Sequence, residues 1–328
     1  MKRREFIRFT AASSIAINSF PSILRAQAEY PNRPIRLIIP FAPGGQTDIL
    51  GRRFAQRFES QLGQAVVVEN KMGAGGVVGS SELVRANSDG YTLSIGTSST
   101  HSISPFLMPK LPYDPLKDFT PIALLAIVPM VIVVHPSVPA KNLKELIDEI
   151  KSQPKKYSYG TAGVGSINHL TGEMFKAQAG GLDLVHVPYK GSGQSVQDLI
   201  GGQIPILMAT YSSVEQYHRS GQARIIVITS ESRSSIAPDI PTAVESGLPK
   251  MISLTFNMLL GPPKLSSSTV NFLANKANFV MNDISFRKSL ESIAVDPVLD
   301  STPEKSLNFL KDQVSIYGSI IKSSGIKI

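Results

Sequence analysis

The fold is decided by the stretch from residue 35 to residue 48, which reads Ile35-Arg36-Leu37-Ile38-Ile39-Pro40-Phe41-Ala42-Pro43-Gly44-Gly45-Gln46-Thr47-Asp48. It begins with a short, mostly apolar run and continues into a turn rich in proline and glycine, a pattern typical of a buried strand that leads into a loop. Apolar residues then recur every four positions at Leu50, Phe54, Phe58 and Leu62. This spacing predicts a helix that ends at Gly63.

The same alternation continues along the chain. Further strands are expected at residues 66–68 and 91–95, which completes a βαβ unit and implies a parallel sheet. The middle of the chain repeats this pattern, with strands expected at 131–134, 157–160, 184–187, 204–208 and 225–228 and helices between them. A proline-rich connector leads to a strand near 254–260 and two amphipathic helices, the last of which begins at Thr302-Pro303.

This order predicts an α/β protein of two lobes, the second inserted into the first. Lobe 1 is expected to comprise residues 29–128 plus 253–328, and lobe 2 residues 129–252. The chain then crosses between the lobes twice, so that a two-segment hinge borders a ligand cleft. The alternative is one continuous doubly wound domain with extra helices.

The first 28 residues have the pattern of an export signal. A basic start is followed by a short apolar run and by Ala26-Gln27-Ala28, after which we expect cleavage. Arg3-Arg4 resembles a twin-arginine signal, although Lys2 departs from it and leaves general secretion open. The chain contains no cysteine, so neither a disulfide nor a lipid-attachment site is expected in what we predict to be a free periplasmic protein.

Charge and composition argue against a nucleic-acid partner. The formal net charge is +8, but half of this excess lies in the predicted signal, and the remaining basic residues are scattered. Only 7% of the residues are aromatic, whereas a nucleic-acid surface needs clustered charge and stacking platforms. A mild positive bias suits an anionic small molecule.

Four polar or glycine-rich turns follow predicted strands, at residues 41–48, 73–79, 96–101 and 161–169. Their glycines allow the backbone to approach a ligand closely, and their hydroxyls and helix-start amides can donate hydrogen bonds to a carboxylate. The alternative is that these are ordinary tight turns and helix caps.

Enzyme motifs are absent from the sequence. The glycine run at 73–79 has Val78 where a dinucleotide fingerprint needs its third glycine, and no G-x-S-x-G motif surrounds Ser166. The five histidines show no metal-binding spacing. We therefore predict no catalytic residue, metal or cofactor, and a protein that is not an enzyme.

Six motifs together resemble the Bug-type (TctC-like) extracytoplasmic solute receptors of tripartite tricarboxylate transporters. They are Pro40-Phe41-Ala42-Pro43-Gly44-Gly45-x-Thr47-Asp48, Glu69-Asn70-Lys71-x-Gly73-Ala74-Gly75-Gly76, Asp89-Gly90-Tyr91-Thr92-Leu93, His186-Val187-Pro188-Tyr189-Lys190-Gly191, Asp198-Leu199-Ile200-Gly201-Gly202-Gln203 and Pro238-Asp239-Ile240-Pro241-Thr242-x-x-Glu245-Ser246-Gly247. The resemblance implies a type II periplasmic-binding-protein fold and a small organic carboxylate as ligand. It also implies delivery to a membrane permease of one large and one small subunit, and we expect the receptor to be a monomer.

In this family the turn of the first lobe holds one carboxylate through backbone amides and ordered water, facing a turn of the second lobe. Carried over to this sequence, the resemblance suggests the following ligand-binding residues: Phe41, Ala42, Gly44, Gly45, Thr47, Asp48, Gly75, Gly76, Thr97, Ser98, Thr100, Thr161, Gly165, Ser166, Lys190 and Thr210. Where many relatives carry Asp or Asn, this chain has Ala209-Thr210. Our hypothesis is that the ligand lacks a charged amine there, because a buried ammonium without a carboxylate partner is costly.

Two other functions remain open at this level. A sensory receptor that presents its ligand to a membrane kinase would have the same sequence features. A periplasmic α/β hydrolase would need a nucleophile, a base and a group that orients the base, and these cannot be assembled from the motifs.

Overall fold

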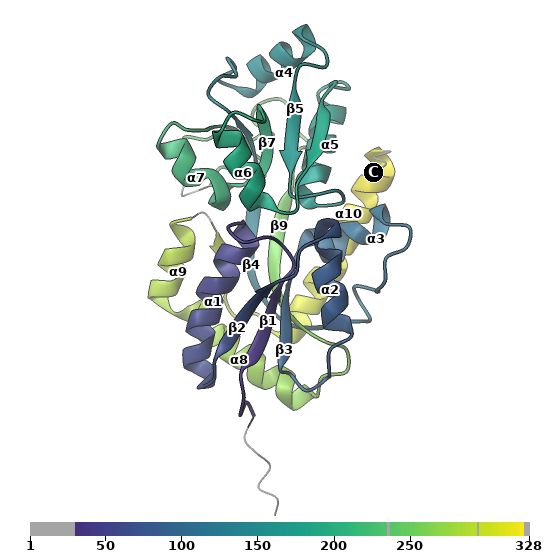
Figure 1. Ribbon diagram of the computed structural model, residues 1–328, viewed down its shortest axis with the longest axis vertical. Coiled ribbons are helices and arrows are strands. Elements are labelled where there is room, and N and C mark those ends of the chain that lie inside the picture. Colours follow the sequence, from purple (N-terminus) through teal and green to yellow (C-terminus); the bar gives the residue numbers. More distant parts are fainter. Residues whose placement is uncertain (1–29, 235–236, 294, 325–328) are drawn as a thin grey trace, which may run out of the picture.

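The computed structural model describes residues 30–234, 237–293 and 295–324, which form two α/β lobes stacked along the long axis of the molecule (Figure 1). The predicted export signal lies outside the described residues. None of the helices in the described part of the chain is long and apolar enough to span a membrane.

The first lobe is built on a mixed sheet. Strand β1 (Ile35–Ile39) lies parallel to β2 (Val66–Asn70) and β3 (Thr92–Gly96), as the βαβ spacing predicts. Antiparallel pairing, which the sequence did not predict, completes the sheet. Strand β9 (Leu254–Gly261) pairs with β3 and with β4 (Thr120–Val134), and the short β10 (Asp296–Pro297) pairs with β4. The helices around it are α1 (Gln46–Leu62), α2 (Val77–Val84), α8 (Ser267–Asn282) and α9 (Ile284–Glu291), with the short turns η1 (Ala74–Gly76), η2 (Ser99–Ile103) and α3 (Ser104–Leu107).

The second lobe repeats this plan. Strand β5 (Ser158–Thr161) lies parallel to β6 (Val185–Pro188) and β7 (Ile206–Thr210), while β7 and β8 (Arg224–Ile228) run antiparallel to the end of β4. Its helices are α4 (Leu143–Ser152), α5 (Ile167–Gln178), α6 (Ser192–Ile200) and α7 (Tyr211–Arg219).

Strand β4 belongs to both lobes. Its residues from Thr120 to Pro129 pair with β9, and those from Met130 to Val134 pair with β7 and β8. The strand runs through Pro129, which lies at the end of the pairing with β9, just before the partners change. The two-lobed fold is confirmed, and we propose 128/129 and 252/253 as the lobe boundaries.

Local sequence signals explain where the helices end. The four apolar residues of the α1 stripe are all buried, and Gly63 adopts a left-handed φ of 66° while its N–H donates to the carbonyl of Glu59. Asn142 caps α4 by accepting a hydrogen bond from the Glu145 N–H (2.9 Å). The prediction that α1 ends at Gly63 is confirmed, and both helix ends depend only on neighbouring residues.

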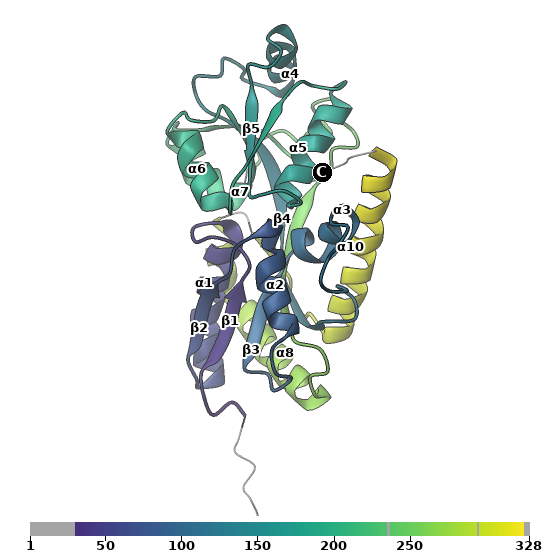
Figure 2. The same cartoon turned by 45° about the vertical axis from the view of Figure 1, so that its right-hand side comes forward.

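The last helix, α10 (Pro303–Ser324), runs along one side of the molecule from the first lobe towards α5 (Figure 2). Thr302 caps it by accepting from the Lys305 N–H, as predicted. Near its other end, the Tyr317 hydroxyl donates to the carbonyl of Leu254, the first residue of β9 (2.6 Å). Tyr317 and Ile321 also pack into the core of the second lobe, so α10 contacts both lobes at the hinge.

Candidate ligand-binding site

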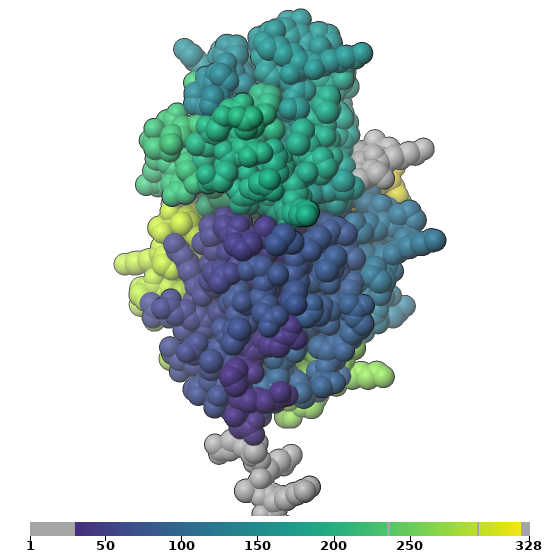
Figure 3. All heavy atoms as spheres, viewed as in Figure 1, coloured from purple at the N-terminus to yellow at the C-terminus, as the bar shows by residue number. Residues whose placement is uncertain are grey.

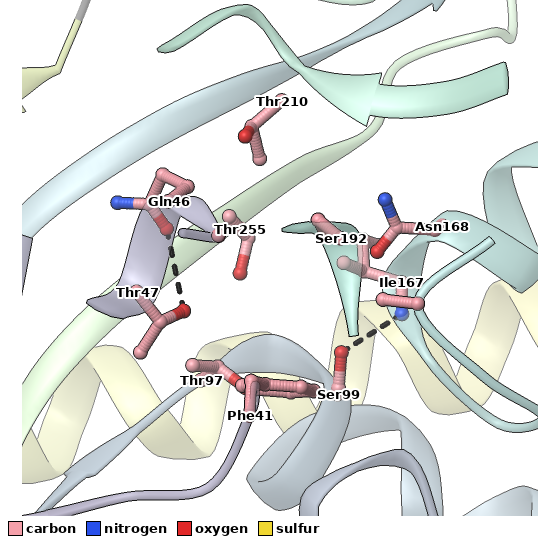
Figure 4. A pocket seen from close by; sticks show the side chains of 12 residues that line it. Phe41, Gln46, Thr47, Thr97, Ser99, Ile167, Asn168, Ser192, Thr210 and Thr255 are labelled. Carbon is pink, nitrogen blue, oxygen red and sulfur yellow. Dashed lines mark hydrogen bonds between the residues drawn. The ribbon is translucent and has the colours of Figure 1, made fainter. Parts of the chain in front are cut away.

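A small cavity lies between the lobes (Figure 4). About 30 Å³ of it is open to the centre of a water molecule. Its lining contains no charged side chain among the described residues and consists of Phe41, Gly45, Gln46, Thr47, Thr97, Ser99, Ala162, Ile167, Asn168, Ser192, Thr210 and Thr255.

Four helices begin at this cavity. Helix α1 starts at Gln46, α5 at Ile167, α6 at Ser192, and α7 directly after Thr210, and all four of these residues line the cavity. The first N–H groups of a helix have no partner within the helix, and the helix dipole places partial positive charge at this end. The cavity is therefore electropositive without any cationic side chain.

The first-lobe turn is held from behind by Asp48. One carboxylate oxygen accepts from the Gly44 N–H (3.0 Å), and the other accepts from Asn70 Nδ2 (2.8 Å) and Arg52 Nε (2.9 Å). Asn70 Nδ2 also donates to the carbonyl of Phe41. Asp48 thus positions the turn from Phe41 to Gly45 and does not line the cavity.

The loop after β3 belongs to the first lobe and makes a hydrogen bond to the second. Thr100 closes this loop by accepting from the Thr97 N–H (3.0 Å), and the Ser98 hydroxyl donates to the Leu254 carbonyl. The Ser99 hydroxyl oxygen accepts from the Ile167 N–H across the lobe boundary (2.9 Å), which leaves its proton available to a ligand.

The second-lobe turn uses most of its hydroxyls internally. Ser166 caps α5 through the His169 N–H and donates to the carbonyl of Gly163 (2.6 Å). Thr161 bonds His186 Nε2 (2.7 Å), and the His186 ring stacks on His169 at 3.8 Å between centroids. Burial lowers the pKa of His186 to about 4 and also lowers the pKa of His169, so both rings are neutral at pH 7.

The lobes meet along a row of small residues that we call the closure seam: Ala42–Gly45 and Gly75 of the first lobe, and Val164, Gly165 and Gly191–Gly193 of the second. A Cβ atom added to Gly75 would lie 2.8 Å from the Val164 carbonyl oxygen, and one added to Gly193 would overlap the Pro43 carbonyl oxygen. Figure 3 shows that the two lobes meet on this face of the molecule without an open groove. The structure is therefore the closed arrangement.

The predicted ligand-binding residues take different places in this site. Phe41, Gly45, Thr47, Thr97 and Thr210 line the cavity. Ala42, Gly44, Gly75 and Gly165 lie in the closure seam, while Asp48, Ser98, Thr100, Thr161 and Ser166 hold the turns and Gly76 packs against Thr100. Lys190 is exposed and does not line the cavity. Their contact with a ligand stays a proposal.

Seven lining residues were not among those predicted: Gln46, Ser99, Ala162, Ile167, Asn168, Ser192 and Thr255. Five of them, Gln46, Ser99, Ala162, Ile167 and Asn168, lie in the polar turns that the sequence marks at 41–48, 96–101 and 161–169, so their segments had a signal but their side-chain directions had none. Thr255 lies on the strand that returns through the hinge, and no sequence pattern marks it.

Acid should destabilise the fold through His101, which is 1% exposed beside Phe119. Burial lowers its pKa from 6.5 to about 3, so the stability it contributes above pH 6.5 is lost as pH falls towards 3 and the unfolded state binds a proton that the folded state does not. Its share between pH 7 and pH 5 is about 2 kcal/mol. We expect His101→Gln, which keeps a partner for Thr100, to flatten the pH dependence of urea unfolding by that amount. An unchanged slope would contradict this.

The chain is similar in sequence and in fold to known solute receptors. Residues 50–326 match the model of the tripartite tricarboxylate transporter family receptor. Protein BugT of Bordetella pertussis is 32% identical over 300 residues, covering 91% of each chain. The solved periplasmic binding protein BugD is 31% identical with a TM-score of 0.88, covering 91% of this chain and 99% of that one. MatC from Rhodopseudomonas palustris with bound malate is 28% identical with a TM-score of 0.86, covering 89% and 100%.

The family model covers well over half of the chain, and the likeness to BugT extends over nearly all of both proteins. The two-lobed fold is shared with periplasmic binding proteins of that group. The chain therefore belongs to the Bug-type receptors of the tripartite tricarboxylate transporter family, which are periplasmic solute-binding proteins.

Proposed function

We propose that this protein captures a small organic carboxylate between its lobes and delivers it to a membrane permease of one large and one small subunit. The observation that carries the proposal is the convergence of four helix N-termini on a cavity lined by neutral side chains. Free N–H groups and the positive ends of helix dipoles favour an anion, and hydroxyls add further donors. The malate bound to the related MatC supports a carboxylate as that anion.

Closure would couple binding to delivery. The cavity is lined from both lobes, so a ligand there contacts both and has a higher affinity for the closed state, which shifts the population towards closure. We infer that the permease recognises the closed form. Export by the signal in residues 1–28, with cleavage after Ala28, and a monomeric receptor complete this proposal.

The alternatives fit the site less well. A hydrolase needs a nucleophile beside a base, but the Ser166 hydroxyl donates to the Gly163 carbonyl and the ring of His169 stacks on His186. A sensory receptor would share the whole site. A neighbouring gene pair that encodes a large and a small membrane protein would favour transport over sensing.

A thermal-shift screen over mono-, di-, tri- and aromatic carboxylates tests the proposal. At a concentration 100 times its dissociation constant, a ligand adds about 2.7 kcal/mol to the free energy of unfolding, which raises the melting temperature by roughly 5 °C in a protein of this size. Mass spectrometry of the same samples should show no product. Stabilisation by no acid would overturn the proposal of a carboxylate receptor, and turnover would favour an enzyme.

A further inference from the structure

The cavity contains an acceptor for which the described residues supply no donor. Asn168 is 5% exposed and lines the cavity, and its Nδ2 donates to the backbone carbonyl of Met208 (2.6 Å). A backbone carbonyl only accepts, so the nitrogen of the Asn168 amide must face Met208 and the oxygen must face the other way. Figure 4 shows this oxygen turned towards the cavity. No donor to it occurs among the described residues.

In Gln46, on the opposite lobe, the amide nitrogen is also bound by the protein, and the amide oxygen can accept a further hydrogen bond. Its Nε2 donates to Asn257 Oδ1 (2.7 Å), and its Oε1 lies on the side of Thr47, whose hydroxyl donates weakly to it at 3.4 Å. A carbonyl oxygen has two lone pairs, so Gln46 Oε1 can accept a second hydrogen bond. Asn257 is completely buried, and this pairing holds the Gln46 side chain in place.

The cavity is therefore not a uniform set of donors. Helix-start N–H groups and the Ser99 hydroxyl can donate, while the amide oxygens of Asn168 and Gln46 can only accept. We propose that the ligand is a small monocarboxylate whose far end carries an uncharged hydrogen-bond donor, a hydroxyl or a carboxamide NH₂, bound by Asn168 Oδ1 with Gln46 Oε1. This inference rests on the proposed function.

Other far ends fit this pair of oxygens less well. A second carboxylate has no proton at neutral pH and would bring its charge against the Asn168 oxygen. An ammonium group would donate, but the described lining has no anionic side chain to balance its charge, and an unpaired buried charge is costly. An alkyl end would leave the Asn168 oxygen buried without a partner. The small open volume favours the shortest acids of the class.

The test uses series of acids that differ in one substituent. Isothermal titration calorimetry would compare 3-hydroxypropanoate with propanoate, malonate and 3-aminopropanoate, and lactate with propanoate, methylmalonate and alanine. A four-carbon series with 4-hydroxybutanoate and succinamate against butanoate and succinate allows for a longer spacing. We expect the hydroxy acid or the amide acid of at least one series to bind about tenfold or more tightly than its alkyl and dicarboxylate counterparts.

Two variants assign the preference to Asn168. Asn168→Leu removes the acceptor, and we expect the affinity ratio of hydroxy acid to alkyl acid to fall to about one. Asn168→Asp replaces the neutral acceptor with a charged one and should shift the preference towards the amino acid of the same series. This second variant keeps the test decisive if Asn168→Leu does not fold. Asn275→Leu, the same change at an exposed position of α8, should leave the ratio unchanged.

Each outcome decides between the two proposals. If dicarboxylates or alkyl acids bind as tightly as the hydroxy and amide acids, this inference is wrong while the carboxylate receptor stands. If the preference exists but survives in Asn168→Leu, Asn168 is not its source and the inference is equally overturned. If no acid of any series binds, this inference falls, and the carboxylate receptor falls with it only if the wider thermal-shift screen also finds no ligand.

Discussion

Gly193→Ala is expected to weaken carboxylate binding by about 100-fold while leaving the protein folded. Gly193 lies in the first turn of α6 with a negative φ, so an alanine suits the helix itself. Its methyl group would overlap the Pro43 carbonyl oxygen of the opposite lobe. Forcing an extra carbon into a packed contact costs about 3 kcal/mol at the upper end, and each 1.4 kcal/mol is tenfold in affinity. We expect the lobes to lie apart at this contact in the open state, so the cost should fall on ligand binding.

Titration calorimetry and small-angle X-ray scattering would measure the effect. The wild-type protein should contract when ligand is added, whereas the variant should not. Gly201→Ala, at the other end of α6, is the matched control, because a Cβ atom there meets only atoms of its own lobe, at 3.3 Å or more. Wild-type affinity in Gly193→Ala would show that tight closure of the seam is not needed for binding.

Asp48→Ala is expected to lower the free energy of unfolding by about 3 kcal/mol and to abolish measurable binding. The Asp48 side chain is 5% exposed, and its loss leaves the Gly44 N–H and the Asn70 amide without their shared acceptor. Removing one partner from a buried charged network typically costs about 3 kcal/mol or more. The turn that presents Phe41 and Gly45 to the cavity then loses its support, so binding falls along with stability.

Urea unfolding and calorimetry separate the two effects. Asp148→Ala provides a control, since it removes another carboxylate that pairs with a cation four residues away, but on an exposed surface where Lys144 and Asp148 are 84% and 60% exposed. Such surface pairs contribute little, so no change in stability or binding is expected. A stable Asp48→Ala variant with wild-type affinity would mean that the turn holds its shape without the carboxylate.

The local elements could be predicted from the sequence because their causes lie within a few residues. The apolar period from Leu50 to Leu62, Gly63 after it and the Asn142 cap each specify a helix or its end by short-range contacts, and the structure has them there. The order of strands and helices also predicted two lobes. The antiparallel pairing of β9 with β3 and β4 was not predictable, because it joins segments more than a hundred residues apart.

The site divides in the same way. The sequence by itself marked three of the turns that border the cavity, at residues 41–48, 96–101 and 161–169, because glycine, proline and hydroxyl residues at strand ends dictate tight turns and helix starts. Only the tertiary structure decided which side chains reach the cavity. The Ser99 hydroxyl receives the Ile167 N–H from 68 residues away, and Gln46 is held by Asn257 at a separation of 211. Side-chain direction depends on partners that meet only when distant segments pack together, as Asn168 meets the Met208 carbonyl 40 residues away, so no local pattern could separate the lining Asn168 from the supporting Ser166.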